Sequence, residues 1–231
     1  VYICKNFNES EKAVHEIFTG KFGKTNKILV EEFINGEEMS YFIISDGKNY
    51  KLFNTAQDHK KVGEGDKGKN TGGMGANSPS SLINPNLNKK ILKKIIEPTL
   101  KALNKRKQKY VGFLYAGLMI KNNEPYLIEY NVRMGDPECQ TILPLLKSDL
   151  LELIIACCKS KLKKINIKWK NKKSLCVVLC SKGYPEKFKN NLKICKINEL
   201  KSIKNNLIFH AGTKVKQDTV YSTGGRVLNF V

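Results

Sequence analysis

Residues 126–138 read YLIEYNVRMGDPE, a strand-like run that ends in a crowd of polar side chains. In a β-strand, side chains two positions apart point to the same face of the sheet. Glu129 and Asn131 are therefore expected to project together. Arg133 and Asp136 follow just beyond the predicted strand, so one strand end brings together two carboxylates, a carboxamide and a guanidinium.

Two oxygen ligands on one face of a strand suit a hard cation. Mg²⁺ takes one or two protein oxygens and completes its octahedron with water and phosphate oxygens, and a carboxamide oxygen adds no charge. Arg133 could hold a phosphoryl oxygen with its planar fork, and Asp136 could bind an ammonium or hydroxyl group. The pattern also fits a polar strand end that leads into a turn. The spacing alone leaves both interpretations open.

The composition bounds the fold and the setting of the chain. Its 231 residues are 41% hydrophobic, which predicts a substantial core in one large domain or up to two smaller ones. No apolar run approaches the ~18 residues of a membrane helix, and the start lacks a secretory pattern. Seven cysteines form no CxxC pair, which favours a reducing, cytoplasmic setting. With no initiator Met and a strand-like last run, both ends resemble cuts through a longer protein.

A formal net charge of +20 raises the affinity of a protein for polyanions in general. Of 41 basic residues only 3 are arginine, and 41 − 3 leaves 38 lysines. Base readout favours arginine, and single-strand binding favours aromatic residues between the basic groups. The lysines here fall in pairs mixed with asparagine, so we predict no specific nucleic-acid partner. A basic, non-catalytic nucleic-acid-binding protein is the alternative from a different functional class.

Apolar periodicity and turn residues predict an α+β chain. Three helices are expected, over 7–23, 84–105 and 148–162. Asn8 or Ser10 can cap the first and Ser148 or Asp149 the third, and Pro98 should kink the second. Longer strands are expected over 27–34, 38–45, 49–54, 112–120 and 125–131, and shorter ones over 174–180, 207–212, 219–222 and 225–231.

A change in composition after the last predicted helix suggests two domains, over 1–164 and 165–231. From about residue 165 the sequence is lysine-rich and contains only short predicted strands. Asp46-Gly47 and the stretch KNNE are turn signals for two hairpins. The polar, glycine-rich segment 55–81 is predicted to be a long loop, and loops of that length are usually functional or disordered.

Two further stretches bear on nucleotide chemistry. In LVEEFINGEEMS (29–40), an extended segment could offer backbone groups to an adenine edge, with a later carboxylate for ribose hydroxyls; an acidic hairpin is the simpler interpretation. In NTGGMGANSP (70–79), Gly72, Gly73 and Gly75 could let backbone N–H groups converge on an anion. A flexible surface loop explains the same glycines, and no Gly-Lys-Ser/Thr closes a P-loop.

Taken together and in order, these motifs resemble the phosphoribosylamine–glycine ligase family, also called glycinamide ribonucleotide synthetase, of the ATP-grasp superfamily. The stretches that carry the resemblance are LVEEFINGEEMS, AQDHKKVGEGDKGKNTGGMGANSP, IIEPTLKAL, GFLYAGLMI, LIEYNVRMGDPECQTILPLLKSDLLELI and HAGTKV…STGGRVL. The resemblance implies an ATP-grasp fold. It consists of part of the small ATP-lid subdomain and the large antiparallel-sheet subdomain, followed by a partial, β-rich C-terminal domain.

The resemblance also implies a role for individual residues. Glu129 and Asn131 match metal ligands, Arg133 matches a charge-stabilising catalytic residue, and Asp136 matches a residue that positions substrate. The residues implied for nucleotide binding are Glu31, Glu32, Phe33 and Ile34 at the adenine and Glu38 at the ribose. Those implied for substrate binding are Asp58, His59, Asn70, Thr71, Gly72, Gly73, Met74, Gly75 and Asp136.

The implied reaction joins glycine to 5-phosphoribosylamine through glycyl phosphate, with ATP and Mg²⁺ or Mn²⁺, in a cytoplasmic monomer or homodimer with no membrane partner. The family's amino-terminal domain, its lysine-bearing glycine loop and the end of its C-terminal domain have no counterpart in these residues. We therefore expect little ligase activity from the 231 residues alone. The nearer alternative is another ATP-grasp carboxylate–amine ligase or carboxylase with a different acceptor.

Overall fold

The computed structural model describes residues 1–200 and 206–231, and the chain divides into two compact units, Val1–Asn35 and Gly36–Val231. The strands are β1 Glu37–Asp46, β2 Tyr50–Asp58, β3 Lys61–Gly63, β4 Lys67–Asn70, β5 Gly75–Ser78, β6 Val111–Lys121, β7 Glu124–Asn131, β8 Ser174–Cys180, β9 Lys193–Ile194, β10 Ile208–His210, β11 Thr213–Lys216, β12 Thr219–Ser222 and β13 Arg226–Phe230. The α-helices are α1 Phe7–Phe18, α2 Pro85–Ile91, α3 Glu97–Lys105, α4 Glu138–Ile142, α5 Leu150–Cys158 and α6 Ile197–Leu200. Short 3₁₀ turns span Leu143–Leu145 and Leu162–Lys164.

The smaller unit contains α1 and an extended segment. Asn6 caps the helix, because its side chain accepts a hydrogen bond from the backbone N–H of Glu9 at 3.0 Å. The predicted caps Asn8 and Ser10 were therefore wrong by a few residues. Their side chains lie inside the first turns, where a polar residue cannot perform the capping role.

The strand predicted over 27–34 is also wrong, because the structure has no strand there. Leu29 and Val30 are 80% and 81% exposed, so the apolar residues of this segment do not enter a core. A strand needs a hydrogen-bonded neighbour, and within the described residues none pairs with this segment.

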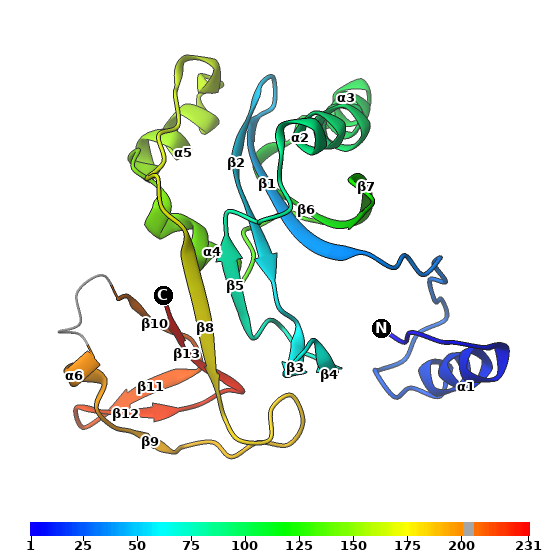
Figure 1. Cartoon of the computed structure of the whole chain (residues 1–231), viewed down its shortest axis with the longest axis vertical. Helices are drawn as coiled ribbons and strands as arrows, with labels where there is room; N and C mark the ends of the chain where they lie inside the picture. Colours follow the sequence, from blue (N-terminus) through cyan, green and yellow to red (C-terminus); the bar gives the residue numbers. More distant parts are fainter. Residues whose placement is uncertain (201–205) are drawn as a thin grey trace. The chain divides into compact units, whose positions relative to one another are not determined.

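The larger unit is built on an eight-stranded antiparallel sheet with the order β10-β13-β8-β5-β2-β1-β6-β7 (Figure 1). Both predicted hairpins are confirmed, since β1 pairs with β2 and β6 pairs with β7. The turn of the second hairpin places Asn122 and Asn123 at φ 51° and 58°, a left-handed conformation that asparagine tolerates better than most residues.

Each face of the sheet is covered by its own helices (Figure 1). Met39, Tyr41 and Ile43 of β1 pack with residues of β6, α2 and α3 on one face. Phe42 and Ile44, which alternate with them, pack with residues of α5 on the other face. The two-residue period of β1 therefore builds two cores at once.

The middle helix is broken where Pro98 was expected to disturb it. A π-helical turn, Leu92–Ile96, separates α2 from α3, and the backbone N–H of Glu97 bonds to the carbonyl of Leu92. Pro98 lies in the first turn of α3 and has no N–H to offer the carbonyl four residues earlier. The widened turn accommodates that missing bond.

The glycine-rich segment 55–81 is largely ordered into strands and not into one long loop. It contains the end of β2, the β3–β4 hairpin and β5, which joins the central sheet between β2 and β8. Gly75 allows this close pairing, since a Cβ there would lie 2.5 Å from the carbonyl oxygen of Cys176.

The four shorter strands predicted near the C-terminus are confirmed as β8, β10, β12 and β13. β8 pairs with β5 and β13, so β8, β13 and β10 extend the central sheet. β9, β11 and β12 form a separate three-stranded sheet. The proposed domain boundary near 165 stays a prediction. In the described ranges, no helix is long and apolar enough to cross a membrane.

Asp46 shows how the β1–β2 turn is tied to the rest of the unit. Its carboxylate accepts hydrogen bonds from the backbone N–H groups of Lys48, Asn49 and Leu162 at 2.9, 2.6 and 3.0 Å, and the residue is 2% exposed. Burial alone would raise the pKa of this carboxyl, but the three N–H groups outweigh burial and lower the pKa.

We predict that Asp46→Ala lowers the free energy of unfolding by about 1–3 kcal/mol at pH 7, because buried N–H groups lose their acceptor. A carboxyl with a lowered pKa stabilises the fold above its unfolded pKa near 3.8 and loses that contribution as the pH falls through the folded pKa. Urea unfolding at pH 7 and below pH 4 should therefore show the difference shrinking in acid. Glu64→Ala, which removes an exposed carboxylate at a position with ordinary backbone angles, is the control; an equal loss there would refute the role of Asp46.

Candidate functional site

Glu129 and Asn131 of β7 project to one face of the sheet, as predicted. The amide nitrogen of Asn131 donates to the carboxylate of Glu129 at 2.9 Å. Tyr130 between them points to the other face, where its hydroxyl donates to the carbonyl of Ile95. Glu129 lies opposite Gly117 of β6, and a Cβ on Gly117 would approach the Glu129 side chain to 3.3 Å.

The pair suits a metal that takes few protein ligands. In the part of the chain that the structure describes, no group of three or more His, Cys, Asp and Glu side chains is placed so that it could hold a metal ion by itself. A metal here would therefore need most of its oxygen ligands from phosphate and water, which is the habit of Mg²⁺. Since the nitrogen of the Asn131 amide faces Glu129, a half-turn of the amide is needed to present its oxygen instead.

A cluster of carboxylates surrounds the half-buried ammonium of Lys60 next to this pair. Lys60 donates to Glu38 at 2.6 Å. Burial would lower the pKa of Lys60, but its hydrogen bond to the Glu38 carboxylate and the nearby negative charges of Glu38, Asp58 and Glu129 outweigh burial, so the pKa is raised. Lys60 therefore stays positively charged among Glu38, Asp58 and Glu129.

Asp58 is the least satisfied carboxylate of the cluster. Its Oδ1 atom is buried and has no hydrogen-bond partner among the described residues. Burial, followed by the charge of Glu138, raises the pKa of Asp58 to about 7. A cationic ligand at this carboxylate would relieve both costs.

Glu138 is 2% exposed and belongs to a buried hydrogen-bond network. The hydroxyl of Ser40 lies 2.9 Å from both Glu138 Oε1 and the Tyr115 hydroxyl. Burial and the charge of Glu138 raise the pKa of Tyr115. Gly135 makes room for the carboxylate, because a Cβ there would overlap it at 2.2 Å.

The predicted substrate loop is held by backbone contacts on both sides. The backbone N–H of Met74 donates to the carbonyl of His59 at 2.8 Å, and the backbone N–H of His59 donates to the carbonyl of Gly75 at 2.9 Å. The N–H of Thr71 donates to Lys60 at 2.8 Å. At Gly73, with φ +110°, a Cβ would lie 2.7 Å from Asp58 Oδ1, so the loop runs directly against the unsatisfied carboxylate.

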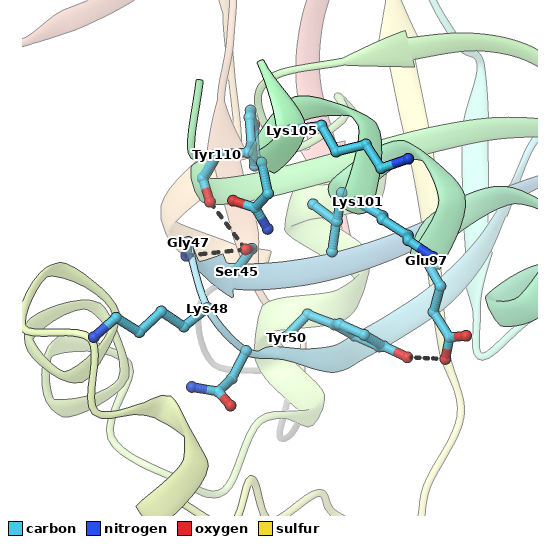
Figure 2. A pocket seen from close by; sticks show the side chains of 11 residues that line it. Ser45, Gly47, Lys48, Tyr50, Glu97, Lys101, Lys105 and Tyr110 are labelled. Atoms are coloured by element: carbon cyan, nitrogen blue, oxygen red, sulfur yellow. Dashed lines mark hydrogen bonds between the residues drawn. The ribbon is translucent and has the colours of Figure 1, made fainter. Parts of the chain in front are cut away.

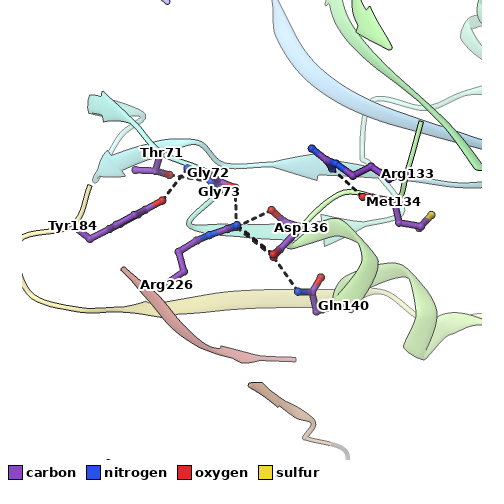
Figure 3. Close-up of polar contacts among 9 residues, drawn as sticks. All are labelled: Thr71, Gly72, Gly73, Arg133, Met134, Asp136, Gln140, Tyr184 and Arg226. Carbon is purple, nitrogen blue, oxygen red and sulfur yellow. Dashed lines mark hydrogen bonds and ion pairs between the residues drawn. The ribbon is translucent and has the colours of Figure 1, made fainter. Parts of the chain in front are cut away.

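The two predicted catalytic residues differ in their hydrogen-bond partners (Figure 3). Within residues 1–200 and 206–231, the exposed Arg133 donates only to the carbonyl of its neighbour Met134, at 3.0 Å. The carboxylate of Asp136 accepts from Gln140 at 3.0 Å and forms an ion pair with Arg226. Asp136 is thus fixed in place, while Arg133 is free to reach a ligand.

The residues predicted for adenine binding lie in the smaller unit. Glu31, Glu32 and Phe33 are exposed and Ile34 is half-buried, all in the extended segment without regular secondary structure. Glu38, Asp58, His59 and Asn70 to Gly75 lie in the larger unit, as do Glu129 and Asn131. His59 contacts Asn77 at 3.1 Å through Nε2, and no carboxylate contact orients its ring in the described structure.

A pocket of about 480 Å³ lies at the opposite end of β1 from Glu38 (Figure 2). Lys48, Lys101 and Lys105 line it, and the hydroxyl of Tyr50 donates to Glu97 at 2.7 Å. None of the sequence-predicted site residues lines this pocket. The carboxylate cluster around Lys60 brings together oxygen ligands and a fixed positive charge, so it is the better candidate site.

The structure adds several residues that the sequence interpretation did not assign. They are Ser40, Lys60, Tyr115, Glu138, Tyr184 and Arg226. Lys60 directly follows Asp58 and His59, which were assigned to the substrate site from the sequence. Its place in the sequence could therefore have indicated a role in that site. Ser40, Tyr115 and Arg226 reach the site only through sheet pairing, which no local pattern reveals.

Comparison with known proteins identifies matches along most of the chain. A family model described as phosphoribosylglycinamide synthetase, ATP-grasp (A) domain, matches residues 1–139. A second, described as phosphoribosylglycinamide synthetase, C domain, matches residues 174–231. Together the two models include both units of the structure.

Individual relatives agree with the family models. The chain is 42% identical to a phosphoribosylamine–glycine ligase of Brucella melitensis, over 99% of this chain and 54% of the relative. It is 43% identical to that of Vigna unguiculata, over 99% of this chain and 75% of the relative. A crystal structure of phosphoribosylamine–glycine ligase from Thermotoga maritima superposes with a TM-score of 0.86 at 31% identity, over 99% of this chain and 56% of that chain. The chain thus spans about half the length of the bacterial relatives.

We predict that Asp58→Asn stabilises the fold at alkaline pH. A carboxyl whose pKa rises on folding, from 3.8 to about 7, destabilises the folded chain progressively as the pH rises between those values. The variant should exceed the wild type in free energy of unfolding by at least about 1 kcal/mol at pH 8 and match it near pH 4.

Urea titrations at the two pH values measure this difference. Asp66→Asn, at an exposed aspartate, is the matched control. A variant that is less stable than the wild type at pH 8, or equally shifted at both pH values, would refute the burial of an unsatisfied carboxylate.

Proposed function

Since this chain belongs to the phosphoribosylglycinamide synthetase family, whose ATP-grasp model covers residues 1–139, we propose that it carries part of an enzyme that ligates glycine to 5-phosphoribosylamine. The α+β fold and the family resemblance predicted from the sequence are confirmed by these matches. The activity is proposed here for the protein that contains the chain, because the chain spans only part of its bacterial relatives.

One observation carries the proposal. Glu129 and Asn131 face the same side of the sheet as Glu38, Lys60 and Asp58. This arrangement combines oxygen ligands for a cation, a fixed positive charge for phosphate, and a carboxylate without a partner. The alternative interpretation is a polar strand end that has no function. It does not explain why Asp58 Oδ1 is buried without a hydrogen-bond partner, which is unfavourable.

The proposed reaction has two steps. A carboxylate oxygen of glycine attacks the γ-phosphorus of ATP, so ADP leaves and glycyl phosphate forms. The nitrogen of 5-phosphoribosylamine then attacks the acyl carbon, phosphate leaves, and the nitrogen loses a proton to give glycinamide ribonucleotide. A carboxylate nucleophile needs no general base in the first step, so alignment and charge neutralisation provide the main acceleration.

The residues of the cluster fit distinct tasks in this scheme. Glu129 and Asn131 would hold Mg²⁺ or Mn²⁺, which when bound neutralises charge on the phosphates. The exposed guanidinium of Arg133 stabilises the transferring phosphoryl group. Asp58 accepts hydrogen bonds from an ammonium group of a substrate, which provides the counter-charge that its buried oxygen lacks.

Nucleotide recognition is proposed for the remaining assigned residues. Glu31, Glu32, Phe33 and Ile34 would offer an extended edge to adenine. The carboxylate of Glu38 would accept hydrogen bonds from the ribose hydroxyls. Its ion pair with Lys60 fixes its orientation before ATP binds. A cytoplasmic location, a monomer or homodimer, and the lack of a specific nucleic-acid partner stay predictions.

Release of ADP by the gene product that contains this chain tests the activity. We expect release to require glycine and 5-phosphoribosylamine together. Replacing glycine with bicarbonate or with other amino acids separates this ligase from an ATP-grasp carboxylase or another carboxylate–amine ligase. Equal turnover with any of these would overturn the assignment. The 231-residue chain alone should show little turnover.

We predict that Glu129→Gln removes the metal dependence of the site. The neutral amide is a weaker ligand for a hard cation, so the affinity for Mg·ATP should fall at least tenfold and ligase turnover at least a hundredfold. Calorimetric titration of Mg·ATP and coupled ADP release measure the two effects.

The control is Glu124→Gln on the same strand, where the carboxylate forms ion pairs with Lys90 and Lys94. Such partly exposed pairs contribute little, so this variant should behave like the wild type. Unchanged kinetics of Glu129→Gln at limiting Mg²⁺ would remove Glu129 from the site.

A further inference from the structure

Three segments far apart in the sequence meet at the guanidinium of Arg226, the first residue of β13 (Figure 3). Arg226 Nη1 donates to the carbonyl of Gly72 and to the carbonyl of Asp136, both at 2.8 Å. The two Nη atoms also face the two carboxylate oxygens of Asp136, at 3.3 and 3.2 Å. One side chain thereby joins the glycine loop to the loop between β7 and α4.

Gly72 is held from both ends by the C-terminal strands and their connection. Its N–H donates to the hydroxyl of Tyr184 at 3.0 Å, and its carbonyl accepts from Arg226. The loop has little room to move, since a Cβ on Gly73 would lie 2.5 Å from Pro137. The same Cβ would lie 2.7 Å from Asp58 Oδ1, so the fixed loop borders the unsatisfied carboxylate.

The contacts require an arginine. A guanidinium presents several N–H groups in one plane, whereas the ammonium of lysine is a point charge that cannot span a carboxylate and two carbonyls at once. Of the 41 basic residues in this chain only 3 are arginine, and one of them stands here. Its side chain is 23% exposed, compared with 50% for Asp136, so the pair is partly shielded from solvent.

We propose that Arg226 is a positioning residue: it fixes Asp136 and the Gly72–Gly73 turn against Asp58, and so shapes the part of the site that binds the non-nucleotide substrates. The inference rests on the proposed ligase function for its catalytic meaning. It makes the C-terminal strands a part of the substrate site, although they carry none of the residues that the family resemblance assigns.

The first test is kinetic and uses the gene product that contains the chain. Arg226→Ala and Arg226→Lys should each raise the KM for glycine or for 5-phosphoribosylamine at least tenfold, with the KM for ATP within twofold of the wild type. Tyr184→Phe, which frees one end of Gly72, should have a smaller effect of the same kind. Arg106→Ala removes the same charge from an exposed position and should leave all three KM values unchanged.

The second test needs no activity and uses hydrogen exchange of the backbone. In Arg226→Ala the amides of 71–75 and 134–140 should exchange at least tenfold faster, while those of β1 and β6 keep their rates. If the wild type does not ligate glycine but this local loosening occurs, the proposed function fails and the positioning contact stands.

Two results would overturn the inference itself. One is a set of KM values for Arg226→Ala equal to those of Arg106→Ala in an active enzyme. The other is uniform acceleration of exchange across the whole sheet in both Arg226 variants, which would give Arg226 a general structural role.

Discussion

The alternation of side chains along β1, β6 and β7 is the constraint on which this structure depends. Ser40 pairs with Gly117, and Gly117 pairs with Glu129, so one row of residues crosses three strands on the polar part of one face. The residues between them fill the core against α2 and α3. A shift of one residue in this register would place Glu129 in an apolar core and expose Tyr130.

The same alignment creates an electrostatic problem that the rest of the larger unit resolves. Glu38, Asp58, Glu129 and Glu138 approach one another on a partly desolvated surface, which is unfavourable for like charges. Lys60 and Arg226 supply opposite charge, and Ser40 donates to Glu138. The compensation is incomplete at Asp58, whose pKa remains near 7. Carboxyl groups with a strongly raised pKa are common at ligand-binding and catalytic sites.

Local patterns predicted the elements that depend on local physics. The β1–β2 and β6–β7 hairpins, the cap at Asp149 and the break before Pro98 were all visible in the sequence. The prediction failed for 27–34 and for 55–81. In the first, apolar residues have no neighbouring strand; in the second, polar and glycine-rich residues are recruited into strands by partners elsewhere in the sheet. In both cases the presence or absence of a neighbouring strand decides the outcome, and the composition of the segment does not.

The sequence by itself determined the hairpins, the cap of α5 and the shared face of Glu129 and Asn131, because each of these follows from backbone geometry within a few residues. The ordered motifs also determined the family. Only the tertiary structure decided that Lys60 stands among carboxylates, that Asp58 keeps an unsatisfied buried oxygen, and that Arg226 ties Gly72 to Asp136. These properties arise from burial and from contacts between residues up to 154 positions apart, which no local pattern encodes.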